Sequence, residues 1–311
     1  MSFYIIGAGS IGVFVAAKLS KNAPVTLVPR DPSSAERFAN GITFTMNDQG
    51  HFQVPCLPWS QIERFEKDSF VLLTTKIYQL GDALREVAKR TDGSQTLVLC
   101  QNGLGVCEEA EKFLPGVKWG RAICWLGVRL EAPATVHVAG VEAMELAGGE
   151  EAPLRRLAET LSASGIPAFW SSNVAPAEWK KALWNVSVNG LCALVQGPNG
   201  LVLEDPFLKP LMDLLMKEAL AVARAQGVHL TDADCARVIE GTRTAGKNRN
   251  STLQDLTYGR ATEMPWLNGA VVRLGLKYGV PTPGHLMIAN LIQHLEKTRV
   301  FADFSVDKSK G

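Results

Sequence analysis

The chain lacks the features that would tie it to nucleic acid or to a membrane. Its 32 basic and 31 acidic residues leave a formal net charge of +1. This balance gives no electrostatic basis for binding nucleic acid or an anionic membrane surface. No apolar run approaches the roughly 18 residues that a membrane-spanning helix requires. We therefore expect neither nucleic acid nor a membrane among the partners of this chain.

The chain also lacks paired or clustered cysteines. Its six cysteines are scattered at positions 56, 100, 107, 124, 192 and 235, and none forms a C-x-x-C pair or a metal-ligand cluster. Their neighbours are mostly apolar, which favours reduced thiols in a core. The apolar N-terminus lacks the basic segment of a secretory signal. We expect a cytoplasmic protein that holds no metal.

The order of hydrophobic patterns predicts two domains, because 311 residues exceed the size of one ordinary core. In the first half, runs typical of buried parallel strands alternate with helical patterns; the runs lie at 3–6, 25–28, 70–74 and 96–100. The next segment is rich in strand patterns, in separate runs at 122–126, 135–138 and 141–146. A helix at 154–163 and a strand at 166–170 follow.

From about Ser171 the chain shows helical patterns, at 176–196, 206–227, 231–240, 251–278 and 284–298. Thr231 suits the N-cap of one of these helices. The patterns therefore predict the α/β class. They place an N-terminal Rossmann dinucleotide-binding domain over residues 1–170, followed by an all-α C-terminal domain over residues 171–311.

The N-terminus carries a G-x-G-x-x-G motif between an apolar strand and a helical pattern. Gly7 allows the tight turn, Gly9 lets the backbone approach phosphate oxygens, and Gly12 lets helix and strand pack closely. We expect the dinucleotide pyrophosphate to lie against this turn, whose residues are Gly7, Ala8, Gly9, Ser10, Ile11 and Gly12. The alternative is a glycine-rich βα turn in another kind of α/β protein.

The end of the second strand bears on the choice of nucleotide. Arg30 follows this strand, and an arginine there accepts the 2′-phosphate of NADP. Asp31 is the rival residue, because a carboxylate there would hold the ribose hydroxyls of NAD. We expect NADP.

Two more polar residues follow predicted parallel strands, where ligands bind in open α/β sheets. Lys76 comes after the strand at 70–74, and Asn102 comes after the strand at 96–100. Both are candidates for binding the cofactor. As alternatives, Lys76 is a solvated lysine at a helix start, and Asn102-Gly103 is a plain turn.

The second half carries a polar stripe on a predicted helix. Lys181, Asn185 and Asn189 are spaced i, i+4, i+8, so they fall within one narrow stripe, and their neighbours are apolar. Such a stripe favours a cleft that holds a polar ligand over bulk water. The alternative is a lysine at a helix edge, with two amides capping neighbouring backbone.

These residues belong to a longer set of blocks in fixed order. The set comprises GAGSIG at 7–12, Thr75-Lys76, QNGLG at 101–105, the 181/185/189 spacing, GPNG at 197–200, STLQD at 251–255, Thr262-Glu263, Asn268-Gly269 and GVPTP at 279–283. Over nearly its whole length the chain resembles the ketopantoate reductase family. The resemblance implies a Rossmann domain joined to a helical domain.

The resemblance also implies a role for each of these residues. Gly7 to Gly12 hold the pyrophosphate, Arg30 binds the 2′-phosphate, and Lys76 and Asn102 lie along the cofactor. Lys181 matches the catalytic lysine and Glu263 the acidic residue that completes the site. The positions that match substrate-binding residues are Asn102, Lys181, Asn185, Asn189, Asn199 and Ser251. Gly190 and Cys192 depart from the family pattern, and we expect them to alter the shape of the pocket.

The implied reaction is the NADPH-dependent reduction of a small 2-oxo acid, first of all ketopantoate to pantoate in the biosynthesis of pantothenate and coenzyme A. An ammonium group at Lys181 polarises the carbonyl and donates the proton, so no metal is required. One alternative is a reductase of another 2-oxo acid or of an imine. A non-enzymatic NADP sensor is a further alternative, although it would have little need for Lys181 and Glu263 together. We expect a monomer or a homodimer.

Overall fold

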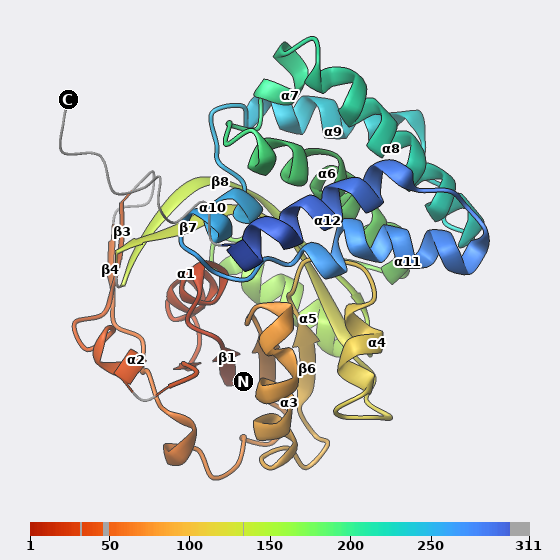
Figure 1. Ribbon diagram of the computed structural model, residues 1–311. Helices are drawn as coiled ribbons and strands as arrows, with labels where there is room; N and C mark the ends of the chain where they lie inside the picture. Colours follow the sequence, from red (N-terminus) through yellow and green to blue (C-terminus); the bar gives the residue numbers. More distant parts are fainter. Residues whose placement is uncertain (32, 46–49, 133, 299–311) are drawn as a thin grey trace, which may run out of the picture. The chain divides into compact units, whose positions relative to one another are not determined.

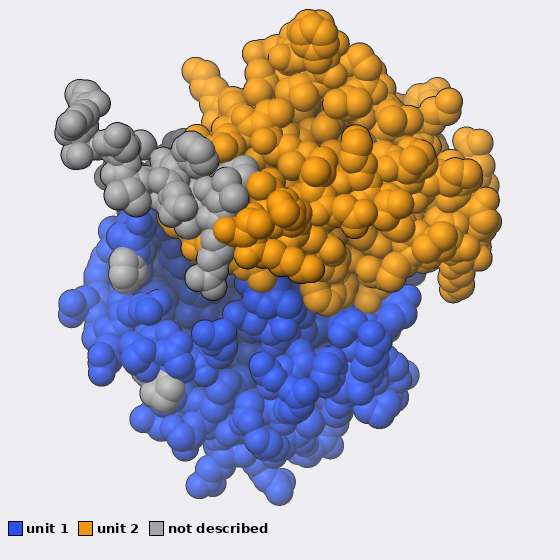
Figure 2. All heavy atoms as spheres, viewed as in Figure 1, with its two compact units in different colours: residues 1–101, 106–177 blue, residues 102–105, 178–311 orange. Residues whose placement is uncertain are grey.

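The computed structural model describes residues 1–31, 33–45, 50–132 and 134–298. Two compact units make up the chain (Figure 2): residues 1–101 with 106–177, and residues 102–105 with the chain from 178 onward. The first unit is an α/β sheet domain, and helices α6 to α12 form an all-helical C-terminal domain (Figure 1). The predicted fold class is therefore confirmed.

The sheet of the first unit runs in the order β2-β1-β5-β6-β7-β8-β3-β4, and β9 also pairs with β8. The first four strands of this order are parallel: β2 (Val25–Val28), β1 (Phe3–Ile6), β5 (Phe70–Leu73) and β6 (Thr96–Leu99). They are almost wholly buried, as their largely apolar sequences predict. From β1 the chain moves to β2 on one side and later to β5 on the other, so the carboxyl ends of β1 and β5 mark a topological switch point.

Helices pack on this sheet. Helix α1 (Ser10–Leu19) contacts α5 (Glu151–Ala163), and α3 (Leu80–Ala88) contacts α4 (Val106–Glu111). Helix α1 buries nearly every residue, and the Phe3 ring stacks on Phe70 at 5.3 Å between ring centroids. The remaining short elements are α2 (Ser33–Glu36), β3 (Ile42–Phe44), β4 (Gly50–Phe52), η1 (Trp59–Gln61) and η2 (Ile77–Gln79).

One strand prediction is wrong. The runs at 135–138 and 141–146 do not form two strands, because both belong to β8 (Thr135–Gly148), which pairs antiparallel with β7 (Gly120–Ala132). The pairing register shifts beside Gly127 and Gly140, where one strand carries an extra residue. A bulge of this kind keeps the strand continuous while it bends. The strand at 166–170 is found as β9 (Ala168–Ser171).

The second unit consists of α6 (Val174–Leu194), α7 (Leu201–Glu204), α8 (Leu208–Ala225), α9 (Asp232–Thr244), α10 (Ser251–Thr257), α11 (Asn268–Tyr278) and α12 (Pro283–Thr298). Thr231 caps α9 in a capping box with Asp234, as predicted. Among the described residues, no helix has both the length and the apolarity that crossing a membrane requires.

The expected single helix at 251–278 is wrong. Helix α10 ends at Thr257, and Gly259 adopts a left-handed φ of 63°. The N–H of Gly259 donates to Leu256 O, and that of Arg260 donates to Asp255 O. This pairing is the Schellman C-cap, which glycine favours. A 3₁₀ turn, η3 (Met264–Trp266), then precedes α11. The break brings Glu263 to the start of η3 rather than to the middle of a helix.

A buried polar network joins the helices of this unit. Asn268 Nδ2 donates to Val186 O of α6 and to Nδ1 of His285, whose Nε2 donates to Leu215 O of α8. The Glu218 carboxylate accepts the N–H groups of Gly284 and His285 at the start of α12. These bonds fix the neutral imidazole, with its proton on Nε2. Burial lowers the pKa of His285 from 6.5 to about 4, and the bond to Leu215 opposes this shift in part.

We expect this imidazole to make stability depend on pH. Its folded pKa lies below the unfolded value, so the unfolded chain binds more protons between about pH 6.5 and about pH 4. The free energy of unfolding should therefore fall by about 2–3 kcal/mol as the pH drops through this window. Urea titrations at pH 7.5 and 4.5 measure the difference. His285→Gln should flatten it, whereas the same change at the exposed His294 should not; an unaltered slope in His285→Gln contradicts the expectation.

Candidate functional site

The glycine turn after β1 has the geometry of a phosphate-binding loop. Gly7 adopts a φ of 113°, and a Cβ there would lie 2.8 Å from Thr75 N. Its N–H donates to Val28 O, while the Thr74 hydroxyl contacts the carbonyls of Ile6 and Gly7. A Cβ on Gly12 would lie 2.0 Å from Gly7 O. Neither position accepts a side chain without moving the backbone.

The start of α1 is open. No described atom lies within 4 Å of a Cβ built on Gly9, the N-cap residue, and no described side chain caps the helix there. The first turn contains no acidic residue. A helix start of this kind offers N–H groups to an anion. The residues between the glycines contribute backbone: Ala8 and Ile11 pack on the core, and the Ser10 hydroxyl accepts the N–H of Leu130.

A cavity of about 620 Å³ lies at the carboxyl ends of β1, β2 and β5. Gly7, Arg30 and Thr75 line it, together with residues of α3. Asp31 does not line it. Its carboxylate instead accepts bonds from Ser33 Oγ, Ser34 N and Ser34 Oγ at the start of α2, and these bonds lower the pKa of Asp31. Of the two rivals at the end of β2, Arg30 is therefore the residue placed to meet a ligand.

The cavity also has walls that the sequence patterns did not indicate. Trp59, Gln79 and Ala83 line it, whereas Lys76 does not. Lys76 is half-buried and caps η2, and its carbonyl accepts the N–H of Gln79. Gln79 follows the carboxyl end of β5, as Lys76 does, so the position of this strand in the sequence could have indicated that Gln79 lines the cavity. Nothing in residue type pointed to Trp59.

The polar stripe of α6 forms as predicted from its spacing. Asn185 and Asn189 are 3% and 1% exposed, and Asn189 Nδ2 donates to Asn185 Oδ1 at 3.4 Å. The buried Oδ1 of Asn189 has no hydrogen-bond partner among the described residues. Lys181, one turn earlier, is half-buried, with its ammonium 5.2 Å from the centre of the Trp184 ring. A buried amide oxygen without a partner is costly, so it marks a place where a ligand can supply one.

Asn199 and Ser251 lie around the N-terminus of α10. Asn199 is buried, and its Oδ1 accepts a bond from Asn250 Nδ2 at 3.2 Å. Asn250 in turn caps α10 by accepting the N–H of Leu253. The N-cap of α10 is therefore Asn250. Ser251 is the first helical residue and is half-buried, and its hydroxyl has no partner among the residues described.

Glu263 is buried, with 5% of its surface exposed. Asn102 Nδ2 donates to its Oε2 at 3.4 Å, and Leu104 N–H donates to Trp266 O at 2.9 Å. Gly103 has a φ of 112°, and a Cβ on it would lie 2.8 Å from Trp266 O. The segment 102–105 thus packs on residues 263–266 within the second unit. The plain-turn alternative for Asn102-Gly103 does not describe this contact between Asn102 and Glu263.

The two departures from the family pattern serve packing. A Cβ on Gly190 would lie 2.3 Å from Ile288 Cγ2, so this glycine lets α6 approach α12. Cys192 is fully buried, its Sγ contacts Asn199 O, and burial raises its pKa to about 12. In the described part of the chain, no group of three or more His, Cys, Asp or Glu side chains is arranged to hold a metal ion.

Comparison with known proteins places the chain among reductases. The family model of ketopantoate reductase PanE/ApbA matches residues 3–150, and its C-terminal model matches residues 173–296. The 2-dehydropantoate 2-reductase of Lactococcus lactis is 31% identical, over 96% of this chain and 98% of that protein.

Solved structures agree with this assignment. D-mandelate dehydrogenase, in a ternary complex with NADH and anilino(oxo)acetate, is 26% identical with a TM-score of 0.89, over 96% of this chain and 99% of that one. A ketopantoate reductase of Ralstonia eutropha is 25% identical with a TM-score of 0.88, over the same shares of the two chains. The chain therefore belongs to the ketopantoate reductase family and is a nicotinamide-dependent 2-oxo acid reductase.

Proposed function

We propose that this chain reduces ketopantoate to pantoate with NADPH, a step in the biosynthesis of pantothenate and coenzyme A. The observation that carries the proposal is the buried stripe of α6, where Asn189 Oδ1 lacks a partner among the described residues and Lys181 lies one turn before Asn185. A non-enzymatic NADP sensor would have little use for this stripe together with a buried Glu263. We further propose residues 1–170 as the NADP-binding domain and 171–311 as the substrate domain, in a cytoplasmic monomer or homodimer.

The cofactor would be held by the first unit. The cradle around Gly7 and Gly12 leaves no space for a side chain, and Gly9 leaves the helix start open, which suits a pyrophosphate. Arg30 would bind the 2′-phosphate, and Lys76 and Asn102 would lie along the cofactor. When bound, the reduced nicotinamide supplies a hydride to the carbonyl carbon.

The remaining roles belong to side chains of the second unit. The Lys181 ammonium would polarise the substrate carbonyl and then donate the proton that the alkoxide requires. Asn185 and Asn189 would bind polar groups of the substrate and orient the lysine. Ser251 would bond the substrate carboxylate, which its free hydroxyl suits, and Asn102 and Asn199 would complete the pocket. Glu263 would support the charged lysine.

A second candidate is the reduction of a 2-oxo acid with an aromatic side chain. It is favoured by the likeness to D-mandelate dehydrogenase, which was solved with NADH. The test is a cofactor-oxidation assay over a panel of 2-oxo acids, ketopantoate and phenylglyoxylate among them, with each of NADPH and NADH. Ketopantoate should give the highest kcat/KM. A clear preference for phenylglyoxylate would overturn the first candidate in favour of the second.

Arg30 should set the cofactor preference. A guanidinium paired with a 2′-phosphate makes charge-assisted bidentate contacts, so Arg30→Ala should erase most of the preference for NADPH over NADH. Calorimetric Kd values for both nucleotides measure this effect. Asp31→Ala is the matched control, because Asp31 is bonded to Ser33 and Ser34 and does not line the cavity. Equal affinities of the unaltered protein for the two nucleotides would refute the role of Arg30.

A further inference from the structure

We propose that Trp59 forms the wall against which the adenine ring of the nucleotide packs, and that Arg90 is the positioning residue that holds this wall in place. The inference rests on the proposed function, because it takes the cavity of the first unit as the adenosine end of the nucleotide site. It adds a binding residue and a positioning residue that the glycine turn and Arg30 do not account for.

The cavity has two distinct ends. Gly7 lies at the end of β1, where a dinucleotide places its pyrophosphate, and Arg30 lies at the end of β2, where it places the adenosine ribose. Trp59 joins Arg30, Ala83 and Glu86 in the lining. Trp59 is the largest flat side chain of this lining. Arg30 and Trp59 line the same cavity, so the proposal places the ribose at Arg30 and the base against the indole.

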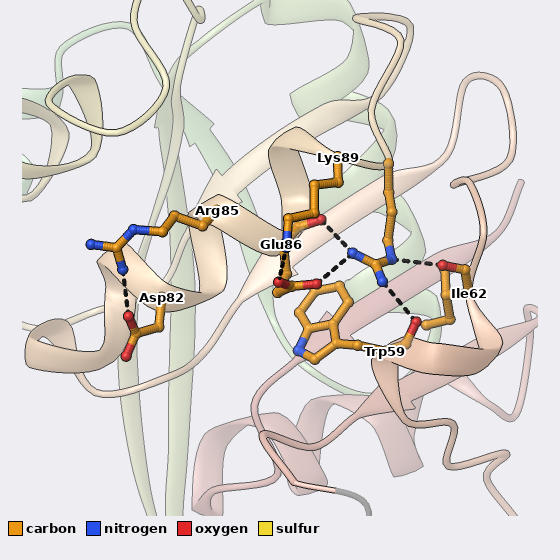
Figure 3. Close-up of polar contacts among 7 residues, drawn as sticks. Trp59, Ile62, Asp82, Arg85, Glu86 and Lys89 are labelled. Carbon is orange, nitrogen blue, oxygen red and sulfur yellow. Dashed lines mark hydrogen bonds and ion pairs between the residues drawn. The ribbon is translucent and has the colours of Figure 1, made fainter.

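The segment that carries Trp59 is too short to fix the ring by itself. Trp59 begins the single 3₁₀ turn η1, in which Ile62 N–H donates back to Trp59 O at 3.1 Å. The segment is instead held from outside by Arg90. Figure 3 labels the residues to which this guanidinium is bonded, Trp59, Ile62 and Glu86. Arg90 Nε donates to Ile62 O at 2.6 Å, and Nη2 donates to Trp59 O at 2.8 Å. Both ends of the turn are thus bonded to one guanidinium.

The same guanidinium is anchored to helix α3. Its Nη1 donates to the carbonyl of Glu86 at 2.9 Å and to the Glu86 carboxylate at 2.7 Å. The Arg90 side chain is only 12% exposed, so these charge-assisted bonds are shielded from water and hold their geometry. Arg90 therefore joins the Trp59 segment to helix α3, whose residues also line the cavity.

Arg90 also holds the ring itself. Its guanidinium carbon lies 5.0 Å from the centre of the Trp59 ring, and the Phe65 ring packs edge-on against the indole with 6.4 Å between ring centroids. Trp59 is half-buried between these groups and still lines the cavity, whereas Arg90 is not part of the lining. Arg90 would thus act on a nucleotide through Trp59. A nucleotide binds more tightly to an indole that is already held in place, because less side-chain entropy is lost when the base packs on it.

The test separates adenine recognition from chemistry. Trp59→Leu should weaken the binding of NADPH and of ADP by about tenfold in calorimetry, with kcat at saturating NADPH unchanged. Turnover with reduced nicotinamide mononucleotide, which has no adenine, should also be unchanged. Trp59→Phe keeps an aromatic ring and should retain affinity within about threefold.

Arg90→Gln should raise the Kd of ADP and the KM of NADPH nearly as much as Trp59→Leu does. Arg90→Lys should restore little of the lost affinity, because an ammonium group lacks the planar set of N–H donors of a guanidinium. Arg155→Gln is the matched control. Arg155 stacks on Trp170 at 4.3 Å in the same unit, and neither residue lines the cavity.

ADP binding by Trp59→Leu within twofold of the unaltered protein would overturn the adenine wall. A lower Tm in Arg90→Gln with unchanged ADP affinity would overturn the positioning role. Tight ADP binding without any reductase activity would refute the proposed function and leave the inference standing, whereas absence of both ADP and NADPH binding would overturn both.

Discussion

Replacing Lys181 with alanine should lower kcat by about a hundredfold or more while the Kd of NADPH changes little. Loss of a positioned general acid typically costs about 10²–10⁴ in rate, and loss of carbonyl polarisation adds to this effect. The residue lies on the same face of α6 as the buried Asn185 and Asn189. Single-turnover hydride transfer and NADPH titration measure the two quantities separately.

Two further variants make this prediction specific. Lys180→Ala should be nearly neutral, because Lys180 lies about 100° away on the helix and makes an ion pair with Asp234 at 3.8 Å, with 40% of its side chain exposed. Lys181→Arg keeps the charge but cannot give up a proton, so it should restore only the part of the rate that polarisation supplies. Equal losses in the two alanine variants would refute both the stripe and the mechanism.

Replacing Glu263 with alanine should reduce kcat by about tenfold to a hundredfold while cofactor binding is nearly retained. Glu263 is buried and bonded to Asn102, so its removal takes a negative charge from the neighbourhood proposed for the substrate and frees the Asn102 amide. A loss of about 1–3 kcal/mol in stability is also expected from breaking a buried hydrogen bond, and unfolding curves measure it separately.

Glu240→Ala is the control for this prediction. Glu240 pairs with Arg243 on the exposed surface of α9, and 65% of each side chain is exposed. Its replacement should leave both kcat and stability nearly unchanged. If Glu263→Ala kept turnover within twofold of the unaltered protein, Glu263 would be a structural partner of Asn102 and not part of the catalytic machinery.

The parts of the fold that sequence predicts well are those that depend on local pattern. Strands β1, β2, β5 and β6 are largely apolar, and Gly7 and Gly12 stand where a Cβ would collide with backbone atoms. The sequence pattern predicts two runs where β8 is one strand, because Ala139-Gly140 lies between them and resembles a turn. The same residue types favour a β-bulge and a turn, and only the pairing with the neighbouring strand distinguishes the two.

The candidate site shows the same division. The spacing of Lys181, Asn185 and Asn189 correctly predicts one helical stripe, because helical periodicity is a local property. The N-cap of α10 is not determined by residue type, since Asn250 and Ser251 both suit that position. In the structure Asn250 accepts the N–H of Leu253 and donates to Asn199, a contact between distant segments. The contact between Arg90 and Trp59 joins residues 31 positions apart through backbone carbonyls. Every residue has a backbone carbonyl, so no pattern of residue types predicts this contact.

The membership of residues 102–105 in the helical unit has a consequence for protein engineering. Their partners are Glu263 and Trp266, so the helical domain is built from two separate stretches of chain. A fragment that ends near residue 170 keeps Asn102 to Gly105 but loses Glu263 and Trp266, on which they pack. A chimera that exchanges the helical domain between two relatives must therefore exchange residues 102–105 as well. Otherwise the loop of one protein would pack against the residues that replace Glu263 and Trp266 in the other.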